Sequence, residues 1–466
     1  MGRSYAGCHS GTEGARRRLG RAIRAIAKSP ADNARVAVIG GGYAGMAAAV
    51  TLAARNIAVS VFEAAKQLGG RARRVGHRDT ALDNGLHILS GAYTETLRLI
   101  RQVNPHHESA LLRLPLAWHI HGEFHLTAPR VPAPLHLLLA LLSARGAGMA
   151  ERFRMAGFLA ALKQTGYRLE QDISVELLLT RHRQSDFMKR VFWRPLCVAA
   201  LNTPPAFASA QIFVNVLRDT MNASRAASDL LLARVDLSAL FPEPAADFVR
   251  SRGGVVELGQ RVTAIDVNGD EFSIVAGGAT QSFSHVICAL PPHQVGAFLA
   301  GISALAEIAA MVGQFGYQPI YSVWLQYPSP VTLPETMLGF ADGPLHWAFD
   351  RGALCGQRGL IGAVISAEGA HQDLSQEELG ALAHAELNRR IGGLPEPQWV
   401  RVIAEKRATF ACTPGLRRPP CVTPLTNFYL AGDYTASDYP ATIESAVRSG
   451  IACADHIAAC GAAPRS

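Results

Sequence analysis

The sequence predicts an α/β protein in which a parallel sheet flanked by helices carries an inserted α+β domain. An apolar strand over residues 35–39 runs through a glycine-rich turn into an alanine-rich helix, and a second apolar strand over 57–62 follows. Near the other end of the chain, the strand over 428–431 again meets a turn and a helix of small residues. With 466 residues, 49% hydrophobic and 18% charged, the chain is long enough for two or three domains.

The first glycine-rich turn has the spacing G-x-G-x-x-G between a strand and a helix. In this setting Gly40 permits the tight turn, Gly42 lets the backbone approach a pyrophosphate, and Gly45 lets the helix pack closely on the strand. Tyr43 and Ala44 lie at the start of the expected helix, where free N–H groups attract phosphate. The pattern therefore predicts a dinucleotide site.

The second strand ends at Glu63, 18 residues after Gly45. A carboxylate at this place can bind the two hydroxyl groups of an adenosine ribose. The strand, turn, helix and terminal acid stand in the right order, which makes the dinucleotide interpretation much stronger than the glycines alone.

The segment Gly69-Gly70-Arg71-Ala72-Arg73 indicates which dinucleotide is bound. It resembles the second FAD-contacting segment of the flavoprotein group that includes amine oxidases, protoporphyrinogen oxidase and carotenoid desaturases. The resemblance implies FAD as cofactor, contacted by Gly70, Arg71 and Arg73. Arg71 is expected at the pyrophosphate or the flavin, because a guanidinium can bind two phosphate oxygens at once.

The same resemblance interprets the turn near the C-terminus. It implies that Asp433, after Gly432, binds the ribityl chain or the pyrophosphate, and that the helix after Thr442 points its N-terminus at the pyrimidine end of the flavin. A helix N-terminus carries about half a positive charge, which stabilises the negative charge of a reduced flavin.

A third cofactor segment is expected over residues 248–265, where Val262 matches the residue whose backbone holds the adenine. Residues 284–292 are interpreted as a strand that returns to the same sheet. The fold expected is a Rossmann-type FAD-binding domain of the glutathione reductase/amine oxidase kind, with an inserted substrate domain. The predicted boundaries are a basic tail at 1–34, the FAD domain at 35–104, 236–299 and 406–466, and the substrate domain at 105–235 and 300–405.

Two further segments resemble one branch of this group. Residues 83–93, Asp-Asn-Gly-Leu-His-Ile-Leu-Ser-Gly-Ala-Tyr, and residues 431–442, Ala-Gly-Asp-Tyr-Thr-Ala-Ser-Asp-Tyr-Pro-Ala-Thr, are similar to those of the hydroxysqualene dehydroxylase family. The resemblance spans about residues 35–458. It implies reduction of hydroxysqualene to squalene, with a long apolar isoprenoid as substrate and other squalene-synthesis enzymes as candidate partners.

Protonation of the allylic alcohol in that reaction needs an acid. The candidates are Asp438 and Tyr439 at the expected helix start, and Asp83 and His87 after the Gly-Gly-Arg segment. We rank Asp438 first and His87 second, although a helix N-terminus favours the ionised carboxylate. Each has a purely structural alternative as a helix cap, a core residue or a partner of an arginine.

Three alternative functions stay open at this stage: a phytoene-type desaturase, a flavin amine oxidase, and an FAD-stabilised lipid carrier without enzymatic activity. The amine-oxidase interpretation lacks an aromatic residue at Thr442, two residues before Glu444, where such enzymes present one wall of the substrate cage. Cys412 is a candidate for a covalent flavin link, but it lacks the glycine-rich surroundings expected for one. No metal site is predicted, and the oligomeric state stays open.

Charge and apolar runs bear on location. Residues 1–30 hold seven basic residues and one acidic residue, so six of the eight net positive charges lie in the tail, and nucleic-acid binding is not expected. The eight cysteines form no C-x-x-C pair, and the tail has no apolar signal region. We expect a cytoplasmic protein held on the inner membrane by residues 134–162 and helped by the basic tail.

Overall fold

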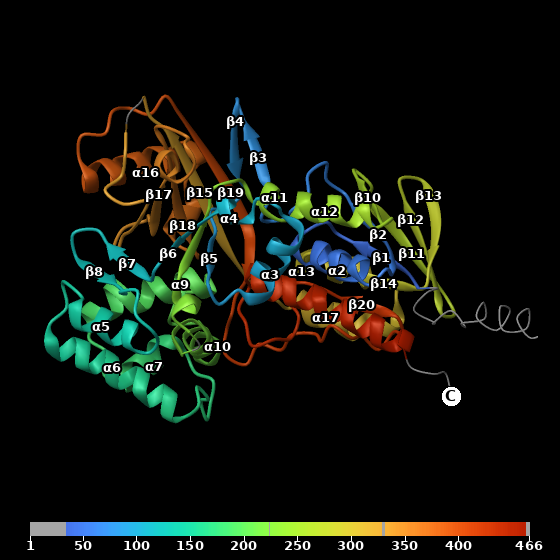
Figure 1. Ribbon diagram of the computed structural model, residues 1–466, viewed down its shortest axis with the longest axis horizontal. Coiled ribbons are helices and arrows are strands. Elements are labelled where there is room, and N and C mark those ends of the chain that lie inside the picture. The colour runs from blue at the N-terminus through green and yellow to red at the C-terminus, as the bar shows by residue number, and fades with distance from the viewer. Residues whose placement is uncertain (1–33, 223, 329–330, 463–466) are drawn as a thin grey trace, which may run out of the picture.

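The computed structural model describes residues 34–222, 224–328 and 331–462 (Figure 1). The predicted basic tail lies outside this range up to residue 33. None of the helices described is both long and apolar enough to cross a membrane.

A five-stranded parallel sheet forms the centre of one half of the molecule, on the right in Figure 1. Its order is β10-β2-β1-β14-β20, and each neighbouring pair is parallel. The α/β class predicted from the sequence is therefore confirmed. The strands come from three separate parts of the chain: β1 (Arg35–Ile39), β2 (Ala58–Glu63), β10 (Val255–Leu258), β14 (His285–Cys288) and β20 (Phe428–Leu430).

Side chains alternate between the two faces of this sheet, as a strand requires. Val36 and Val38 of β1 pack with helix α2 (Tyr43–Ala54), whereas Ala37 and Ile39 belong to the cluster on the opposite face. That face is covered by an antiparallel sheet, β11-β12-β13, and Phe62 of β2 packs edge-on against a phenylalanine of β13. The covering strands are β11 (Val262–Asn268), β12 (Glu271–Ala276) and β13 (Ala279–Phe283).

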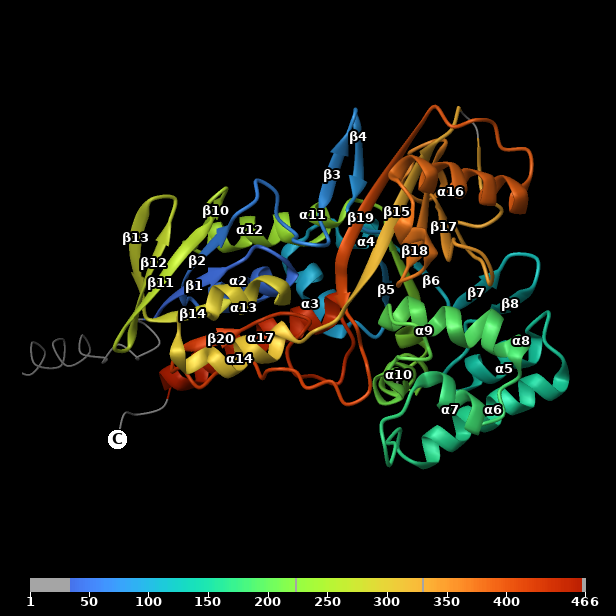
Figure 2. The same ribbon diagram turned by 180° about the vertical axis from the view of Figure 1, so that it is seen from behind.

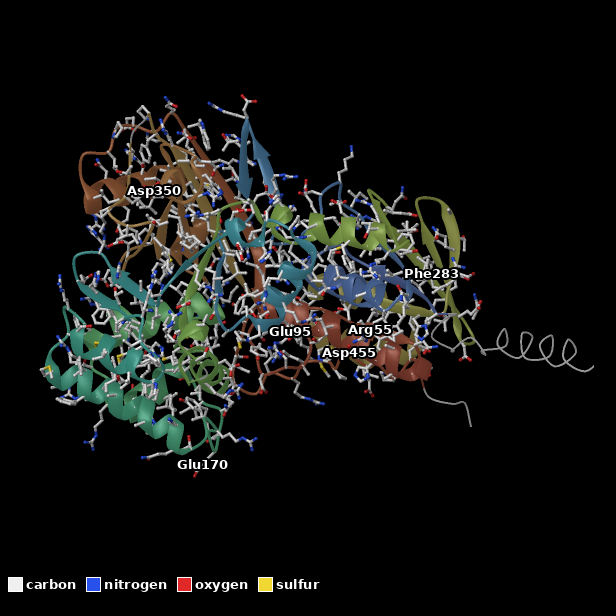
Figure 3. All side chains as sticks on the ribbon, viewed as in Figure 1. Arg55, Glu95, Glu170, Phe283, Asp350 and Asp455 are labelled. Carbon is white, nitrogen blue, oxygen red and sulfur yellow. The ribbon has the colours of Figure 1, made fainter. Side chains whose placement is uncertain are left out.

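The helical face is closed by α12 (Pro242–Ser251) and α17 (Ile443–Ala462). Helices α2 and α17 pack so closely that a Cβ on Gly450 would overlap the carbonyl oxygen of Ala44. Arg55, the C-cap residue of α2, and Asp455 of α17 form an ion pair (Figure 3). This packing fixes where α17 begins, and thus where its N-terminal N–H groups lie.

The other half contains a seven-stranded sheet and a group of helices (Figures 1 and 2). Helix α16 (Gln376–Ile391) packs on the sheet through Leu379, Ala383 and Leu387. The sheet order is β19-β15-β18-β17-β16-β7-β8: β19 (Trp399–Phe410), β15 (Tyr317–Gln326), β18 (Leu360–Ser366), β17 (Trp347–Asp350), β16 (Met337–Gly339), β7 (Ala117–Ile120) and β8 (Phe124–Thr127). The helices are α5 (Leu135–Ser143), α6 (Met149–Gln164), α7 (Val175–Arg181), α8 (Asp186–Met188), α9 (Arg194–Leu201) and α10 (Ala210–Leu217).

Shorter elements connect the two halves. Two small sheets are β5-β9-β6 and β3-β4, with β5 (Ile88–Ser90), β9 (Leu230–Ala233), β6 (Leu111–Leu114), β3 (Arg74–His77) and β4 (Thr80–Asp83). The remaining helices are α3 (Thr94–Val103), α4 (His107–Ala110), α11 (Leu237–Leu240), α13 (Pro292–Leu299), α14 (Ala306–Gly313) and α15 (Arg351–Cys355). The predicted domain boundaries stay predictions, and the one at residue 406 falls inside β19.

Candidate functional site

The glycine-rich turn after β1 is shaped by its own packing at two of its three key positions. Gly40 has a φ of 113°, and a Cβ there would lie 2.7 Å from the carbonyl oxygen of Ala289. A Cβ on Gly45 would overlap the carbonyl oxygen of Gly40. These two glycines are therefore required by the protein itself, whether or not a ligand is bound.

Gly42 is different, because nothing in the protein requires a glycine there. Its φ of −77° suits any residue, and the nearest atom to an added Cβ would be Cα of Gly70, at 3.9 Å. Gly42 is the N-cap of α2 and provides no side-chain cap, so the N–H groups of the first helical turn face this space. A space kept free of side chains at a helix N-terminus fits a pyrophosphate group.

The predicted ribose and adenine contacts lie at one edge of the sheet. Glu63 accepts hydrogen bonds from the N–H groups of Gly41, at 2.7 Å, and Ala65, at 2.8 Å, which fix its carboxylate. The N–H of Gln260 donates to the carbonyl oxygen of Glu63, at 2.9 Å, and Val262 follows as the first residue of β11. The structure thus brings Glu63 near Val262, and their contacts with the ribose and the adenine stay predictions.

Tyr43 and Ala44 are both buried in the first turn of α2. The hydroxyl of Tyr43 donates to the carbonyl oxygen of Leu237, at 2.8 Å, and its ring lies beside Phe241. The side chains therefore serve the core, and these residues can reach a dinucleotide only through their backbone N–H groups.

Arg71 and Asp433 form a largely buried ion pair, with 2.6 Å between Nη2 and Oδ1 and with the Asp433 side chain 6% exposed. The other terminal nitrogen of Arg71 donates to the carbonyl oxygen of Ala408, at the end of β19. Arg73 instead donates to the carbonyl oxygen of Gly70, at 2.7 Å, and so braces the turn. The sequence predicted the two partners separately and did not predict that they meet.

The N-terminus of α17 is held by reciprocal hydrogen bonds. The N–H of Thr442 donates to the hydroxyl of Ser445, at 3.1 Å, and the N–H of Ser445 donates to the hydroxyl of Thr442, at 3.2 Å. Further back, the N–H of Gly432 donates to the hydroxyl of Ser449, at 2.8 Å, which ties the turn after β20 to the helix. The helix start and the Gly432-Asp433 turn are therefore fixed relative to each other.

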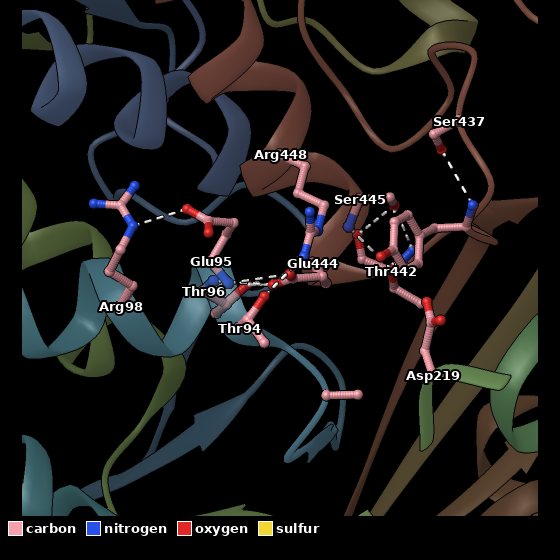
Figure 4. A network of polar contacts seen from close by, with 12 residues as sticks. Thr94, Glu95, Thr96, Arg98, Asp219, Ser437, Thr442, Glu444, Ser445 and Arg448 are labelled. Carbon is pink, nitrogen blue, oxygen red and sulfur yellow. Dashed lines mark hydrogen bonds and ion pairs between the residues drawn. The ribbon is translucent and has the colours of Figure 1, made fainter. Parts of the chain in front are cut away.

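Glu444 anchors this helix start, and the sequence analysis missed its role (Figure 4). The carboxylate is fully buried; it accepts from the N–H groups of Glu95 and Thr96, at 3.1 and 2.9 Å, and pairs with Arg448, at 2.7 Å. It thereby satisfies N–H groups at the start of α3, which no preceding residue caps by its side chain. The sequence shows only that an acidic residue is expected in the first turn of α17. It does not show that this acid binds the start of α3, about 350 positions away.

Of the four acid candidates, Asp438 and Tyr439 lie in the loop between β20 and α17. The Asp438 side chain is 71% exposed and lies 3.8 Å from Arg218, so it is not the desolvated carboxylate that the sequence-based ranking assumed. Helix α17 begins only at Ile443, and Asp438 is therefore not its cap. Tyr439 is half-buried under the guanidinium of Arg448, 5.1 Å from its ring centre, and burial raises its pKa.

Asp83 and His87 lie closer to the Gly-Gly-Arg segment. Burial raises the pKa of Asp83 to about 7, but its carboxylate accepts the N–H of Leu237, at 2.8 Å, and so caps the start of α11. His87 is half-buried, with Nδ1 2.8 Å from the carbonyl oxygen of Gly85. Burial, together with the charge of Arg71, lowers the pKa of His87. Among the four candidates, His87 is the one whose pKa is affected by Arg71.

Three ionisable residues near Arg71 were not found from the sequence. The rings of His293 and Tyr317 lie 6.1 Å apart, and the guanidinium of Arg407 lies 6.0 Å from the Tyr317 ring. Burial lowers the pKa of His293, and the charges of Arg407 and Arg71 lower it further. These residues come from α13, β15 and β19, so no local pattern could group them.

Cys412 does not have the surroundings of a flavin attachment site. It is buried, and burial raises the pKa of its thiol to about 12. A thiol that stays protonated is a poor nucleophile. We therefore expect the flavin to be held without a covalent link.

Comparison with known proteins identifies the family. Residues 43–458 match the flavin containing amine oxidoreductase family. The chain is 31% identical to hydroxysqualene dehydroxylase of Rhodopseudomonas palustris, over 92% of this chain and 99% of that protein. It is 30% identical to hydroxysqualene dehydroxylase of Sinorhizobium fredii, over 90% and 97%. The chain belongs to the hydroxysqualene dehydroxylase family.

A solved structure supports the fold assignment. Cyclohexylamine oxidase from Brevibacterium oxydans matches with a TM-score of 0.64 and 16% identity, over 91% of this chain and 99% of that chain. At this identity the likeness concerns the fold alone. Together with the family match, it makes the protein an FAD-dependent oxidoreductase, and the alternative of a carrier without enzymatic activity is set aside.

The contrast between Gly42 and Gly45 gives a test of the cofactor site. Gly42→Val should abolish FAD binding and leave the thermal unfolding of the FAD-free protein nearly unchanged, because its side chain would enter only the space left for the pyrophosphate. Gly45→Val should fail to fold, because its Cβ would overlap backbone. FAD retention after gel filtration and unfolding followed by circular dichroism measure the two effects. A Gly42→Val protein that keeps FAD would contradict the assignment.

The absence of a covalent link has its own test. Acid precipitation of the purified yellow protein should release all flavin into the supernatant, and Cys412→Ser should keep its flavin content. Absorbance of the supernatant and pellet measures the partition. Flavin that stays in the pellet of the parent protein but not of Cys412→Ser would show a bond to this thiol.

Proposed function

We propose that the protein reduces hydroxysqualene to squalene. The observation that carries the proposal is the similarity to hydroxysqualene dehydroxylases along nearly the whole chain, including the Asp83–Tyr93 and Ala431–Thr442 segments. The cofactor-binding residues support it, since they leave a side-chain-free space at Gly42 and bring Glu63 and Val262 together.

In this reaction the substrate alcohol gains one proton and one hydride and loses one molecule of water. The proton goes to the oxygen of the allylic alcohol, the C–O bond breaks with departure of water, and a C–H bond forms on the delocalised cation. Bound FAD in its reduced form supplies the hydride. The chain must therefore provide a proton donor and an apolar space from which water is excluded.

His87 replaces Asp438 as the proposed proton donor. Asp438 is exposed, and the carboxylate of Asp83 already accepts a hydrogen bond at the start of α11. His87 lies near Arg71, and its Nδ1 is hydrogen-bonded to the backbone. With Nδ1 held by the carbonyl oxygen of Gly85, Nε2 is the nitrogen that takes up and delivers the proton. Because its pKa is lowered, the protonated form is a minor but stronger acid near neutral pH.

The pH dependence tests this role. The dehydroxylation rate should rise as the pH falls below about 6.5, because a group with a lowered pKa becomes protonated only in that range. In His87→Gln the rise should disappear and the rate should fall by about 10² or more. Single-turnover squalene formation, measured between mildly acidic and neutral pH, provides the profile.

Asp438→Asn and Asp83→Asn serve as comparisons. Asp438→Asn should keep both the rate and the profile of the parent protein, because the carboxylate is exposed. Asp83→Asn should keep the pH dependence of the parent protein, because its amide oxygen can still accept the N–H of Leu237 and His87 is unchanged. A slow Asp438→Asn beside a normal His87→Gln would return the acid role to Asp438.

The substrate assignment is tested by product analysis. Anaerobic protein reduced with dithionite should convert hydroxysqualene to squalene, whereas oxidised protein should not desaturate phytoene. A primary amine should not reduce the flavin, since Thr442 offers no aromatic wall and its hydroxyl is bonded to Ser445. Desaturated phytoene, with no squalene from hydroxysqualene, would favour the desaturase alternative instead.

We also propose that the protein is cytoplasmic and binds the inner membrane through a leucine surface on α5 and α6. Six large apolar side chains there are between 42% and 65% exposed: Leu135, Leu138, Leu139, Leu142, Met149 and Phe153. Residues 128–169 hold six basic residues and one acidic residue, Glu151, so positive charge accompanies the apolar side chains. An apolar patch with a basic surround suits an anionic lipid surface.

Vesicle binding tests the leucine surface. The double variant Leu139→Glu, Phe153→Glu should no longer bind anionic vesicles, because two charged side chains would have to enter the lipid. The variant also loses the stabilisation from burying the two apolar side chains, about 25 cal/mol per Å² of apolar area. Leu374→Glu is the matched control, since Leu374 is also exposed but lies outside the surface. Deletion of residues 1–30 should weaken binding at low salt only. Cosedimentation measures all three, and an unchanged double variant would contradict the proposal.

A further inference from the structure

A cavity of about 700 Å³ lies between α3, β6 and the first turns of α17. Thr94, Asp219 and Arg448 are among its lining residues and appear in Figure 4. Its size is within the range of about 300–1,000 Å³ that holds small ligands. None of the residues that shape the dinucleotide turn lines it.

One part of the lining is strongly basic. Four arginines reach it from four different elements: Arg101 of α3, Arg113 of β6, Arg218 after α10, and Arg448 of α17. Two lining residues are acidic, Glu108 and Asp219, and Asp219 pairs with Arg218 at 2.6 Å. Among the described residues, Arg101 forms no ion pair.

Two of these arginines are held in place by carboxylates buried behind them. Arg113 pairs with Asp229, at 3.1 Å, and Arg448 pairs with Glu444, at 2.7 Å; both acids are at most 3% exposed. Each pair uses only part of the five donors that a guanidinium has. The remaining donors are therefore preorganised, which is what an oxygen-rich anion requires.

The other part of the lining is apolar. Leu97 of α3 and Leu111 of β6 are half-buried lining residues, whereas Ile100 and Leu231 are at most 2% exposed. Inorganic phosphate would not use such a surface, but a ligand with a hydrocarbon chain would bury area against it.

We propose that this cavity binds an anionic amphiphile, with its phosphate group among the four arginines and its chain over Leu97 and Leu111. Arginine favours phosphate because its planar fork bonds two oxygens together, and four forks from separate elements match a group with oxygens on several sides. The proposal does not depend on the dehydroxylase reaction. The phosphate can belong to a prenyl diphosphate or to a phospholipid, and the two sources are separated by experiment.

Calorimetric titration of the full-length, FAD-saturated protein tests the proposal, since saturation with FAD removes the pyrophosphate site as a competitor. The ligands are farnesyl diphosphate, a short-chain phosphatidic acid, inorganic diphosphate and farnesol. We expect at least one of the two phosphate-bearing amphiphiles to bind tighter than inorganic diphosphate, and the tighter of the two identifies the source. If inorganic diphosphate bound as tightly as both, the apolar part of the proposal would be overturned.

Arg101→Gln is the decisive variant, because Arg101 is exposed and its removal leaves no buried acid unpaired. It should weaken the phosphate-bearing ligands by about tenfold, the effect of one charged hydrogen bond, while farnesol binding stays the same. Arg101→Lys should restore part of the affinity. Arg98→Gln, on the same helix but outside the cavity lining, is the matched control. Equal affinity of Arg101→Gln and the parent protein for all phosphate ligands would overturn the proposal.

Discussion

A buried ion pair between Arg71 and Asp433 joins the parts of the chain from which the cofactor site is built. Arg71 follows β2, Asp433 follows β20, and the same guanidinium also binds the carbonyl oxygen of Ala408 at the end of β19. The turn of the Gly-Gly-Arg segment, the last strand of the parallel sheet and the longest strand of the other half therefore meet at one side chain. This contact therefore helps to fix the relative position of the two halves.

A buried ion pair is a costly way to gain stability, because desolvation of the two charges offsets much of their attraction. Its place at this junction is better explained by the cofactor, whose phosphates and flavin need fixed charges and donors. The same logic applies to Glu444, which is fully buried and fixes the starts of α3 and α17. Both pairs hold helix and strand ends at set positions, so that backbone N–H groups are aimed before a ligand arrives.

Local features were predictable from the sequence, and features made by distant parts of the chain were not. The turn at Gly40–Gly45 and the acid at Glu63 follow from spacing along one strand–turn–helix unit, and the structure places them as expected. Asp438 was ranked first as the acid because it precedes a helix, but its exposure is set by packing that no pattern contains. The pairing of Arg71 with Asp433 crosses 362 positions of the chain, so only the fold reveals it.

We propose that the cofactor held at this junction delivers its electrons to an isoprenoid alcohol. The most direct test of this proposal is anaerobic stopped-flow mixing of the dithionite-reduced protein with hydroxysqualene, followed by the visible absorbance of the flavin. We expect reoxidation of the flavin within a single turnover, with one squalene formed for each flavin oxidised. A flavin that stays reduced in the presence of saturating hydroxysqualene would contradict it.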